Sequence, residues 1–311
     1  MNLQETLESK HQQPTPKRAA VATVQTVVGV VREVREGVEA PRPVLVCGRA
    51  APAARARAAL LEGGGDEHLV QAFAFRRLRP EDSERMREAA VVVYAGEVAT
   101  SLDRETSDDL DVVAASGRPV VVVLEGIDVP GEVLIEAARR RGINPGDVIG
   151  SRTGAFPDHR LRATVAAVAG DAAAGLASGL PAIRSIVVAR LIDTAAKQNG
   201  VVAAAVWIPG VDMPVLTALE LRLVMQIAAC YGHELGPDRA VELAGVVGAG
   251  FGLRAVAREL LDLVPLAGWI VKGAVAYSGT RAIGKAAEEY FERGAVADLT
   301  SLRTRVEELR S

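Results

Sequence analysis

The sequence has few aromatic residues and very little cysteine. Of its 311 residues, 4% are Phe, Trp or Tyr, whereas 49% are hydrophobic. A hydrophobic core must therefore be built mainly from Ala, Val and Leu, and disorder over most of the chain is excluded. The chain has two cysteines, which excludes a small disulfide-stapled fold and favours a reducing, cytoplasmic compartment.

An excess of positive charge and a long apolar run are also missing. Lys and Arg number 36 against 39 Asp and Glu, a net charge of -3, which argues against a protein that coats nucleic acid. Residues 1–18 contain no apolar stretch, so we expect no signal peptide. The most apolar window, 198–219, is interrupted by Asp212, prolines and glycine. A buried helical core and a membrane-associated hairpin or interfacial helix both stay open for this region.

The chain divides into five segments. We expect a flexible arm over 1–18, an amphipathic helix over 19–40, an α/β domain over 41–178, a helical domain over 179–294 and a C-terminal amphipathic helix over 295–311. Both terminal helices carry apolar residues at heptad spacing, namely Val24, Val27, Val31, Val34 and Val38, and Leu299, Leu302, Val306 and Leu309. They either pair with each other, within or between protomers, or dock onto the helical domain.

Runs of β-branched residues mark the strands of the α/β domain. They lie at 43–50, 89–96, 118–126 and 147–154. The segments between and after them predict helices over 52–61, 100–116, 131–143 and 159–176. This alternation predicts a doubly wound, parallel α/β sheet.

Strand patterns disappear after Gly179. The remainder predicts an all-α domain rich in Gly and Ala, with helices over 182–199, 214–231, 237–263 and 267–293. Breakers such as Gly200-Val201 and the prolines of 208–214 separate the helices.

The turn after the first strand lacks the side chains that bind phosphate. A phosphate-binding loop, GxxxxGK[ST], needs glycines for its curled backbone, a lysine for charge and a hydroxyl for Mg²⁺. Gly48 matches the first glycine, but the other three positions hold Ala53, Ala54 and Arg55. No lysine lies between Lys17 and Lys197. The sequence therefore predicts a domain without nucleotide hydrolysis and without catalytic residues.

In order and spacing, residues 43–175 resemble the translation-factor class of P-loop GTPases in degenerate form. Asp128 stands at the last position of the family's guanine-specifying Asn-Lys-x-Asp, and Ser151 stands in its second guanine loop, followed by Arg152. The family's DxxG switch is missing between Asp66 and Ala90. The resemblance implies a pseudo-GTPase domain with no cofactor and no metal. Its vestigial nucleotide-site positions are Gly48, Arg49, Asp128, Ser151 and Arg152.

Residues 181–293 resemble a helical domain of unknown function associated with bacterial GTPases. The similarity lies in the IPG-x-D turn at 208–212, the apolar helix 221–232, the glycine cluster 245–252, the Pro-Gly break at 264–268 and Ala-x₃-Tyr-Phe at 286–291. Members of that family are fused to, or encoded beside, Era-like GTPases, and several are inner-membrane proteins. The resemblance implies a protein partner of the GTPase class.

Other patterns favour structural roles. The glycine cluster departs from a dinucleotide fingerprint because Leu253 stands at the third glycine position, so close helix packing is favoured. The arginine runs 76–79 and 139–141 could hold an acidic partner or lipid head groups, but solvated faces are the expectation for both.

Together these patterns predict a non-catalytic pseudo-GTPase scaffold or regulator. It would act through a protein partner, a true GTPase being the first candidate, or self-associate through its terminal helices, with no nucleic acid. We expect it in the cytoplasm, and peripheral or integral contact with the inner membrane stays open. The alternatives are an atypical nucleotide hydrolase and a membrane-associated, self-assembling structural protein.

Overall fold

The computed structural model describes residues 41–98, 102–126, 131–151, 156–205, 212–233 and 268–293, and a few single residues between 29 and 38. The chain forms two compact units. The first, here called the α/β unit, comprises Glu36–Thr194, Gln226–Glu234 and Gly284–Ser311. The second, the helical unit, comprises Met1–Arg35, Ala195–Met225 and Leu235–Ile283.

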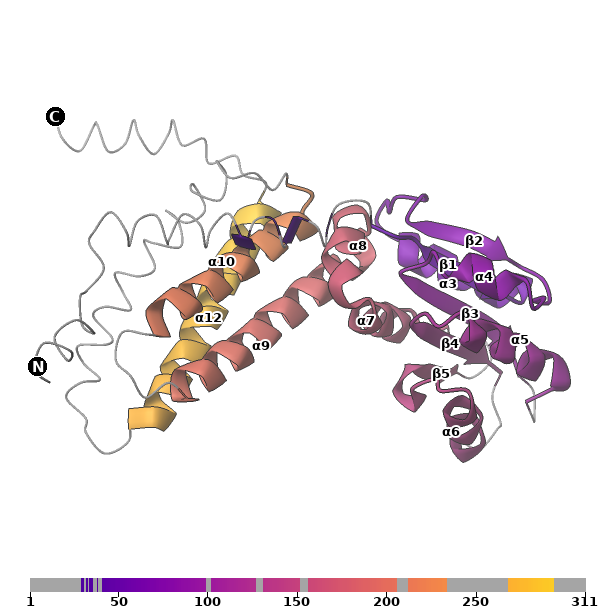
Figure 1. Cartoon of the computed structure of the whole chain (residues 1–311). Coiled ribbons are helices and arrows are strands. Elements are labelled where there is room, and N and C mark those ends of the chain that lie inside the picture. The colour runs from indigo at the N-terminus through magenta and orange to yellow at the C-terminus, as the bar shows by residue number, and fades with distance from the viewer. Residues whose placement is uncertain are drawn as a thin grey trace, which may run out of the picture. The chain divides into compact units, whose positions relative to one another are not determined.

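The α/β unit is built on a five-stranded sheet. Its strands are β1 (Val44–Gly48), β2 (Val70–Ala74), β3 (Val91–Glu97), β4 (Val120–Glu125) and β5 (Val148–Ser151). All neighbouring strands are parallel, in the order β2-β1-β3-β4-β5 (Figure 1). The predicted parallel α/β sheet is confirmed.

Helices cover both faces of the sheet. One face carries α3 (Ala50–Leu61) and α7 (Asp158–Val168), and the other carries α4 (Asp82–Met86), α5 (Arg104–Ala115) and α6 (Gly131–Arg140). Side chains of a strand alternate between faces, so Val92 and Tyr94 of β3 join the core under α4, α5 and α6, whereas Val91 and Val93 point to the α3 side. All four are fully buried.

Two parts of this unit differ from the sequence prediction. The helix expected over 159–176 is broken, because Gly170 has a left-handed φ of +53°. After α7 comes a 3₁₀ turn, Gly170–Ala172, and then α8 (Ala173–Gly179). Strand β2 and helix α4 were not predicted. β2 is an edge strand of only five residues in which Gln71 and Ala72 are exposed, so it has no continuous apolar run.

The described residues after Gly179 are mostly helical, as predicted. It contains α9 (Pro181–Ala205), α10 (Asp212–Cys230) and α12 (Gly268–Glu292). The break expected at Gly200 is wrong, because α9 continues through it. A Cβ on Gly200 would lie 3.2 Å from the carbonyl oxygen of Gly273, so the glycine permits a close approach of α9 and α12 rather than ending the helix.

Several predicted segments lie outside the described residues: the helix over 237–263, the glycine cluster 245–252, the C-terminal seam and most of the N-terminal seam. Within the described part of the chain, the helices are too short or too polar to cross a lipid bilayer.

The α/β unit also includes one end of each long helix, namely the start of α9 and the C-terminal ends of α10 and α12. Arg184 of α9 donates hydrogen bonds to the carbonyl oxygens of Ala177 and Ser178 at 3.0 and 2.8 Å, which caps α8. Its guanidinium lies 5.4 Å from the ring centre of Tyr231, just after α10. Tyr231 in turn stacks on Phe291 of α12.

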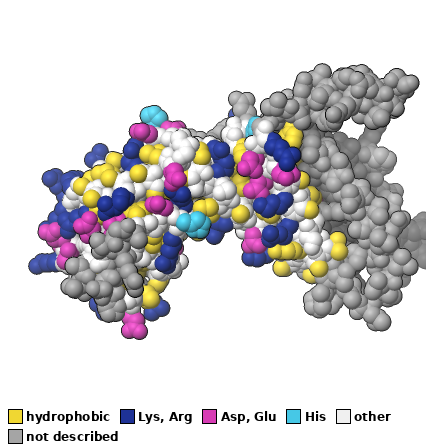
Figure 2. Space-filling view, turned by 180° about the vertical axis from the view of Figure 1, so that it is seen from behind, with side chains coloured by type: hydrophobic (Ala, Val, Ile, Leu, Met, Phe, Trp, Pro, Cys, Tyr) yellow, Lys and Arg dark blue, Asp and Glu magenta, His cyan; other side chains and the backbone are white. Residues whose placement is uncertain are grey.

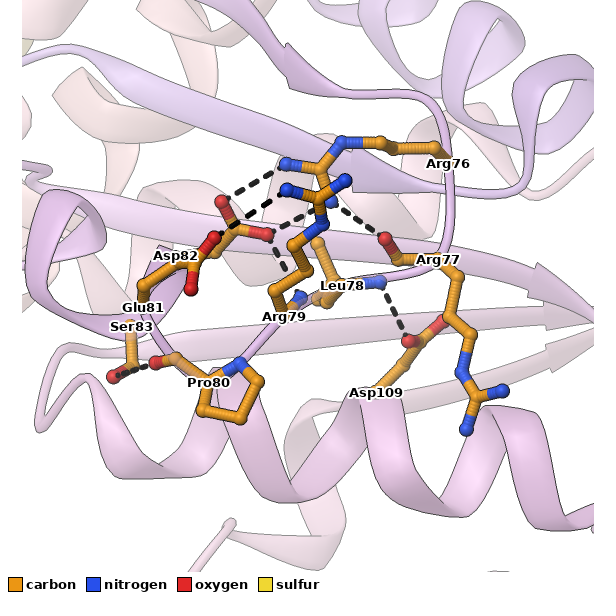
Figure 3. A network of polar contacts seen from close by, with 9 residues as sticks. All are labelled: Arg76, Arg77, Leu78, Arg79, Pro80, Glu81, Asp82, Ser83 and Asp109. Carbon is orange, nitrogen blue, oxygen red and sulfur yellow. Dashed lines mark hydrogen bonds and ion pairs between the residues drawn. The ribbon is translucent and has the colours of Figure 1, made fainter.

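A buried carboxylate, Asp82, fixes the loop between β2 and α4. It accepts two hydrogen bonds from Arg76, at 2.9 and 3.0 Å, and one from the amide of Arg79 at 2.8 Å (Figure 3). Burial acts to raise the pKa of Asp82, but these donors outweigh it and hold the pKa below its usual value. The arginine run is therefore tied to the domain's own acids.

A second buried carboxylate, Asp109 of α5, joins that loop to the sheet. It accepts the amide of Leu78 at 2.8 Å (Figure 3) and the hydroxyl of Tyr94 at 3.2 Å. Asp109 is fully buried, and burial raises its pKa despite these donors. Asp82 is bound by a guanidinium, whereas Asp109 receives these two hydrogen bonds from neutral groups, so the charge of Asp109 is only partly compensated.

The end of β1 approaches β3 very closely. Gly48 has a φ of +115°, and a Cβ there would lie 2.1 Å from the carbonyl oxygen of Ala95. The same carbonyl accepts the amide of Arg49 at 2.9 Å. Only glycine fits this position.

We expect Gly48→Ala to lower the free energy of unfolding by about 2–6 kcal/mol, from backbone strain plus steric overlap. Gly64 is the matched control, because its φ is +83° but nothing lies within 4 Å of its Cβ position. Gly64→Ala should cost about 1–2 kcal/mol. Urea denaturation followed by circular dichroism measures both, and equal costs would contradict the close approach of β1 to β3.

Asp82→Asn and Asp109→Asn should have opposite pH dependences. The stability that Asp82 supplies is present above its unfolded-state pKa of about 3.9 and lost at lower pH, so its variant is most destabilised near neutral pH. Asp109 is penalised when charged, so Asp109→Asn gains relative to the wild type as the pH rises from about 4.

Asp109→Ala, which leaves the Leu78 amide and the Tyr94 hydroxyl without their acceptor, should cost about 1–3 kcal/mol. Denaturation curves between acid and neutral pH measure all three variants. The same pH slope for both asparagine variants would contradict this interpretation.

Candidate functional site

The natural place for a ligand in this fold is the carboxyl edge of the sheet. The strand order reverses between β1 and β3, and in open parallel sheets ligands bind outside the strand ends at that switch point. The residues at this edge are Gly48 and Arg49 after β1, Glu97 at the end of β3, Glu125 at the end of β4 and Ser151 at the end of β5.

The turn from β1 to α3 is too short to surround a phosphate. β1 ends at Gly48 and α3 begins at Ala50, so Arg49 alone connects them. The positions that would carry a second glycine, a lysine and a hydroxyl, 53–55, lie inside the helix. Pro52 has no N–H, and the amide of Ala53 donates to the carbonyl of Arg49 at 2.9 Å. Few backbone donors are left to face a ligand.

Arg55 of α3 lies at the carboxyl edge of the sheet and contacts two carboxylates. Its Nε donates to Glu125 Oε1 at 3.0 Å, and its Nη2 donates to the other oxygen of the same carboxylate. Nη2 is also 3.8 Å from Glu97 Oε1. The Glu125 side chain is only 8% exposed, against 61% for Glu97 and 45% for Arg55. The bidentate pair with Glu125 is thus the better shielded of the two contacts.

The two glutamates would repel each other without Arg55. Glu97 and Glu125 are direct register partners on neighbouring strands, and like charges at such positions are destabilising. Ser151 is the next register partner of Glu125. Its hydroxyl oxygen is buried and has no hydrogen-bond partner among the described residues.

A second ion pair lies at the same edge. Arg49 Nη2 contacts Glu105 Oε2 of α5 at 2.6 Å. Glu105 lies in the first turn of α5, whose N-cap Asp103 accepts the amide of Thr106 at 2.6 Å. The arginine at the switch point is thus directed to the start of a neighbouring helix rather than to a ligand.

Of the predicted nucleotide-site positions, Gly48, Arg49 and Ser151 lie at this edge. Asp128 and Arg152 lie outside the described residues. Sequence reasoning missed Glu97, Glu105 and Glu125 as partners of the arginines. The acidic residue that ends each of two adjacent buried strands, VVVYAGE and VVVVLE, was the available signal.

The charged surface of the α/β unit is mixed in sign. In the arginine runs, Arg77 pairs with Asp108 at 2.7 Å, Arg140 with Glu136 at 2.9 Å and Arg141 with Asp111 at 2.6 Å. Basic and acidic side chains are interspersed on the face seen in Figure 2. Within the residues that the structure describes, no three His, Cys, Asp or Glu side chains lie close enough together to hold a metal ion.

The helical unit contains a separate buried polar group. The side-chain amide of Asn199 donates to the hydroxyl of Thr280 at 2.8 Å, and this hydroxyl lies 3.4 Å from a carboxylate oxygen of Glu220. Each of the three residues is at most 1% exposed. They come from α9, α12 and α10, so the contact links three helices near the Gly200–Gly273 approach.

Comparisons with known proteins concern the C-terminal part of the chain. Residues 169–311 match the model of a family described as "Domain of unknown function (DUF697)". This agrees with the helical domain of unknown function expected from the sequence.

Among curated proteins, a similar one is magnetosome membrane protein 22 of Magnetospirillum gryphiswaldense, 35% identical over 103 residues. The matched stretch is 30% of this chain and 52% of the relative, so the chain spans about half of that protein's length. No solved structure matches the chain. The C-terminal helical part is therefore similar to a domain of unknown function, and the likeness of the α/β unit to GTPases stays a prediction.

Proposed function

We propose that this protein is a non-catalytic scaffold or regulator, whose α/β unit resembles a GTPase but does not use nucleotide and acts through a protein partner. One observation carries the proposal. At the switch point of the sheet, a one-residue turn and the Arg55–Glu125 ion pair occupy the place that a phosphate-binding loop needs.

Electrostatics support the same conclusion. A nucleoside triphosphate and its Mg²⁺ require cationic side chains and free backbone amides around the phosphates. Arg49 and Arg55 are both engaged by carboxylates, and Glu97 adds exposed negative charge beside them. A triphosphate would have to displace these pairs and approach two carboxylates, which is unfavourable.

The nature of the partner comes from the C-terminal half. Its resemblance to GTPase-associated helical domains favours a true GTPase as the partner. The name of the magnetosome relative favours action at a membrane surface. In this proposal the protein provides binding surfaces for its partner and catalyses no reaction itself.

Isothermal titration calorimetry of the full chain with GTP or ATP and Mg²⁺ should give dissociation constants weaker than about 1 mM. The same result is expected for Arg55→Ala, because removing the guanidinium does not lengthen the β1–α3 turn. A micromolar affinity that depends on Mg²⁺, or turnover abolished by changes at this turn, would contradict the proposal and favour the atypical hydrolase.

Arg55→Ala should nevertheless be less stable than the wild type by about 1–3 kcal/mol, because it leaves the buried Glu125 without its donor. Adding Glu125→Gln should recover part of that loss, since the repulsion between the two glutamates disappears. Glu97→Gln alone, at an exposed position, should change stability by less than about 1 kcal/mol. Full additivity of Arg55→Ala and Glu125→Gln would show that the ion pair is not formed.

Membrane association is a second candidate property, favoured by the name of the relative. We expect part of the protein to sediment with membranes after cell fractionation and to be released by high salt, because exposed ionic contacts are screened. Retention after the salt wash would indicate inserted segments instead. A protein found wholly in the supernatant at low salt would count against a role at the membrane.

A further inference from the structure

A groove lies between α5 and α6, away from the Arg55 cluster. Its volume is about 540 Å³. Leu102, Ser107 and Asp111 line one side of it, and Glu132, Val133 and further residues of α6 line the other, with Arg141 just after the end of α6. The groove separates two helices that cover the same face of the sheet.

The bottom of this groove is apolar. A smaller cavity, lined among others by Leu110, Val122 and Leu134, shares Leu102 and Ala137 with the groove. Leu102 packs against the hydrophobic core of the unit, so the apolar part of the groove lies next to that core. Val133, on the wall, is 47% exposed, one of the few large hydrophobic side chains in the described residues with this exposure.

The shape suits an elongated ligand. On α6 the lining residues Glu132, Glu136 and Arg140 are four residues apart, as are Ser107 and Asp111 on α5. Such rows run along a helix, and eight residues of helix span about 12 Å. The groove therefore extends over roughly two helical turns, which fits a segment of peptide better than a compact metabolite.

Of the charged side chains that line the groove, one acid forms no ion pair with the described residues. Arg141 contacts Asp111 at 2.6 Å and Arg140 contacts Glu136 at 2.9 Å, so both guanidiniums are paired within the protein. Glu132 forms no ion pair with the residues that the structure describes. The groove thus offers an apolar floor and one exposed carboxylate at the N-terminal end of α6.

We propose that this groove binds an amphipathic helix of a partner protein, with apolar side chains on the floor and a Lys or Arg beside Glu132. The mode is that of a helix in a groove, in which apolar anchors supply affinity and rim charges supply selectivity. The proposal rests on the proposed function only in that the latter requires a protein partner.

Two labelled helical peptides of about 14 residues, long enough for about 21 Å, test this with the full chain at low salt. Both carry the same leucine stripe, and the remaining positions are lysine-rich in one and glutamate-rich in the other. Fluorescence anisotropy should show tighter binding of the cationic peptide by about two- to fivefold, the range of an exposed charge pair. Hydrogen exchange should slow in α5 and α6.

Two matched pairs of variants locate the site. Val133→Gln should weaken binding of the cationic peptide, whereas Ile135→Gln, at an exposed residue of the same helix that does not line the groove, should not. Glu132→Lys should remove or reverse the preference for the cationic peptide. Glu88→Lys makes the same charge change at an exposed position between α4 and β3 and should leave the preference intact.

Lack of binding by either peptide, preference for the anionic one, or equal effects of both members of a pair would overturn the proposal. These outcomes are independent of the nucleotide titration, so failure of the groove and failure of the proposed function can be told apart. Binding of the cationic peptide that survives Val133→Gln and Glu132→Lys would place it elsewhere and reject the groove.

Discussion

The contact on which the switch point depends is the guanidinium of Arg55 between Glu97 and Glu125. Parallel pairing of β3 and β4 puts the two acids side by side, and the Arg55 guanidinium from α3 relieves their repulsion. The arginine can reach them because a single residue, Arg49, separates α3 from β1, so that the helix passes close to the strand ends. Turn length, helix position and charge pairing are thus parts of one arrangement, and it leaves little for a phosphate to bind.

Internal arginine pairs recur through the α/β unit. Asp82 is held by Arg76 and the Arg79 amide, Asp111 by Arg141, and Glu62 by Arg162. Arginine can donate two parallel hydrogen bonds to a carboxylate, which lysine cannot. The Asp82 contacts fix the loop between β2 and α4, and the other two pairs connect α5 to the end of α6 and the end of α3 to α7.

Much of the fold followed from local pattern. The runs VVVYAGE and VVVVLE predicted buried strands because burial on both faces demands unbroken apolar sequence. β2 was not predicted because an edge strand does not need a continuous apolar run. The predicted helix break at Gly200 was wrong because local sequence does not show the neighbour of this glycine. Whether the glycine ends a helix or permits close packing of two helices depends on Gly273, 73 positions away.

The candidate site was predicted only in part. Gly48 and Arg49 follow directly from their place after the first strand. Their acidic partners do not, since Arg49 meets Glu105 and Arg55 meets Glu125 at sequence separations of 56 and 70 residues. Those pairings require the strand order, which local sequence does not specify.

A last consequence concerns α9, α10 and α12, each of which belongs to both units. A fragment that ends at Gly179 would lack Arg184, Tyr231 and Phe291. These residues belong to the α/β unit, so the fragment would be an incomplete α/β unit.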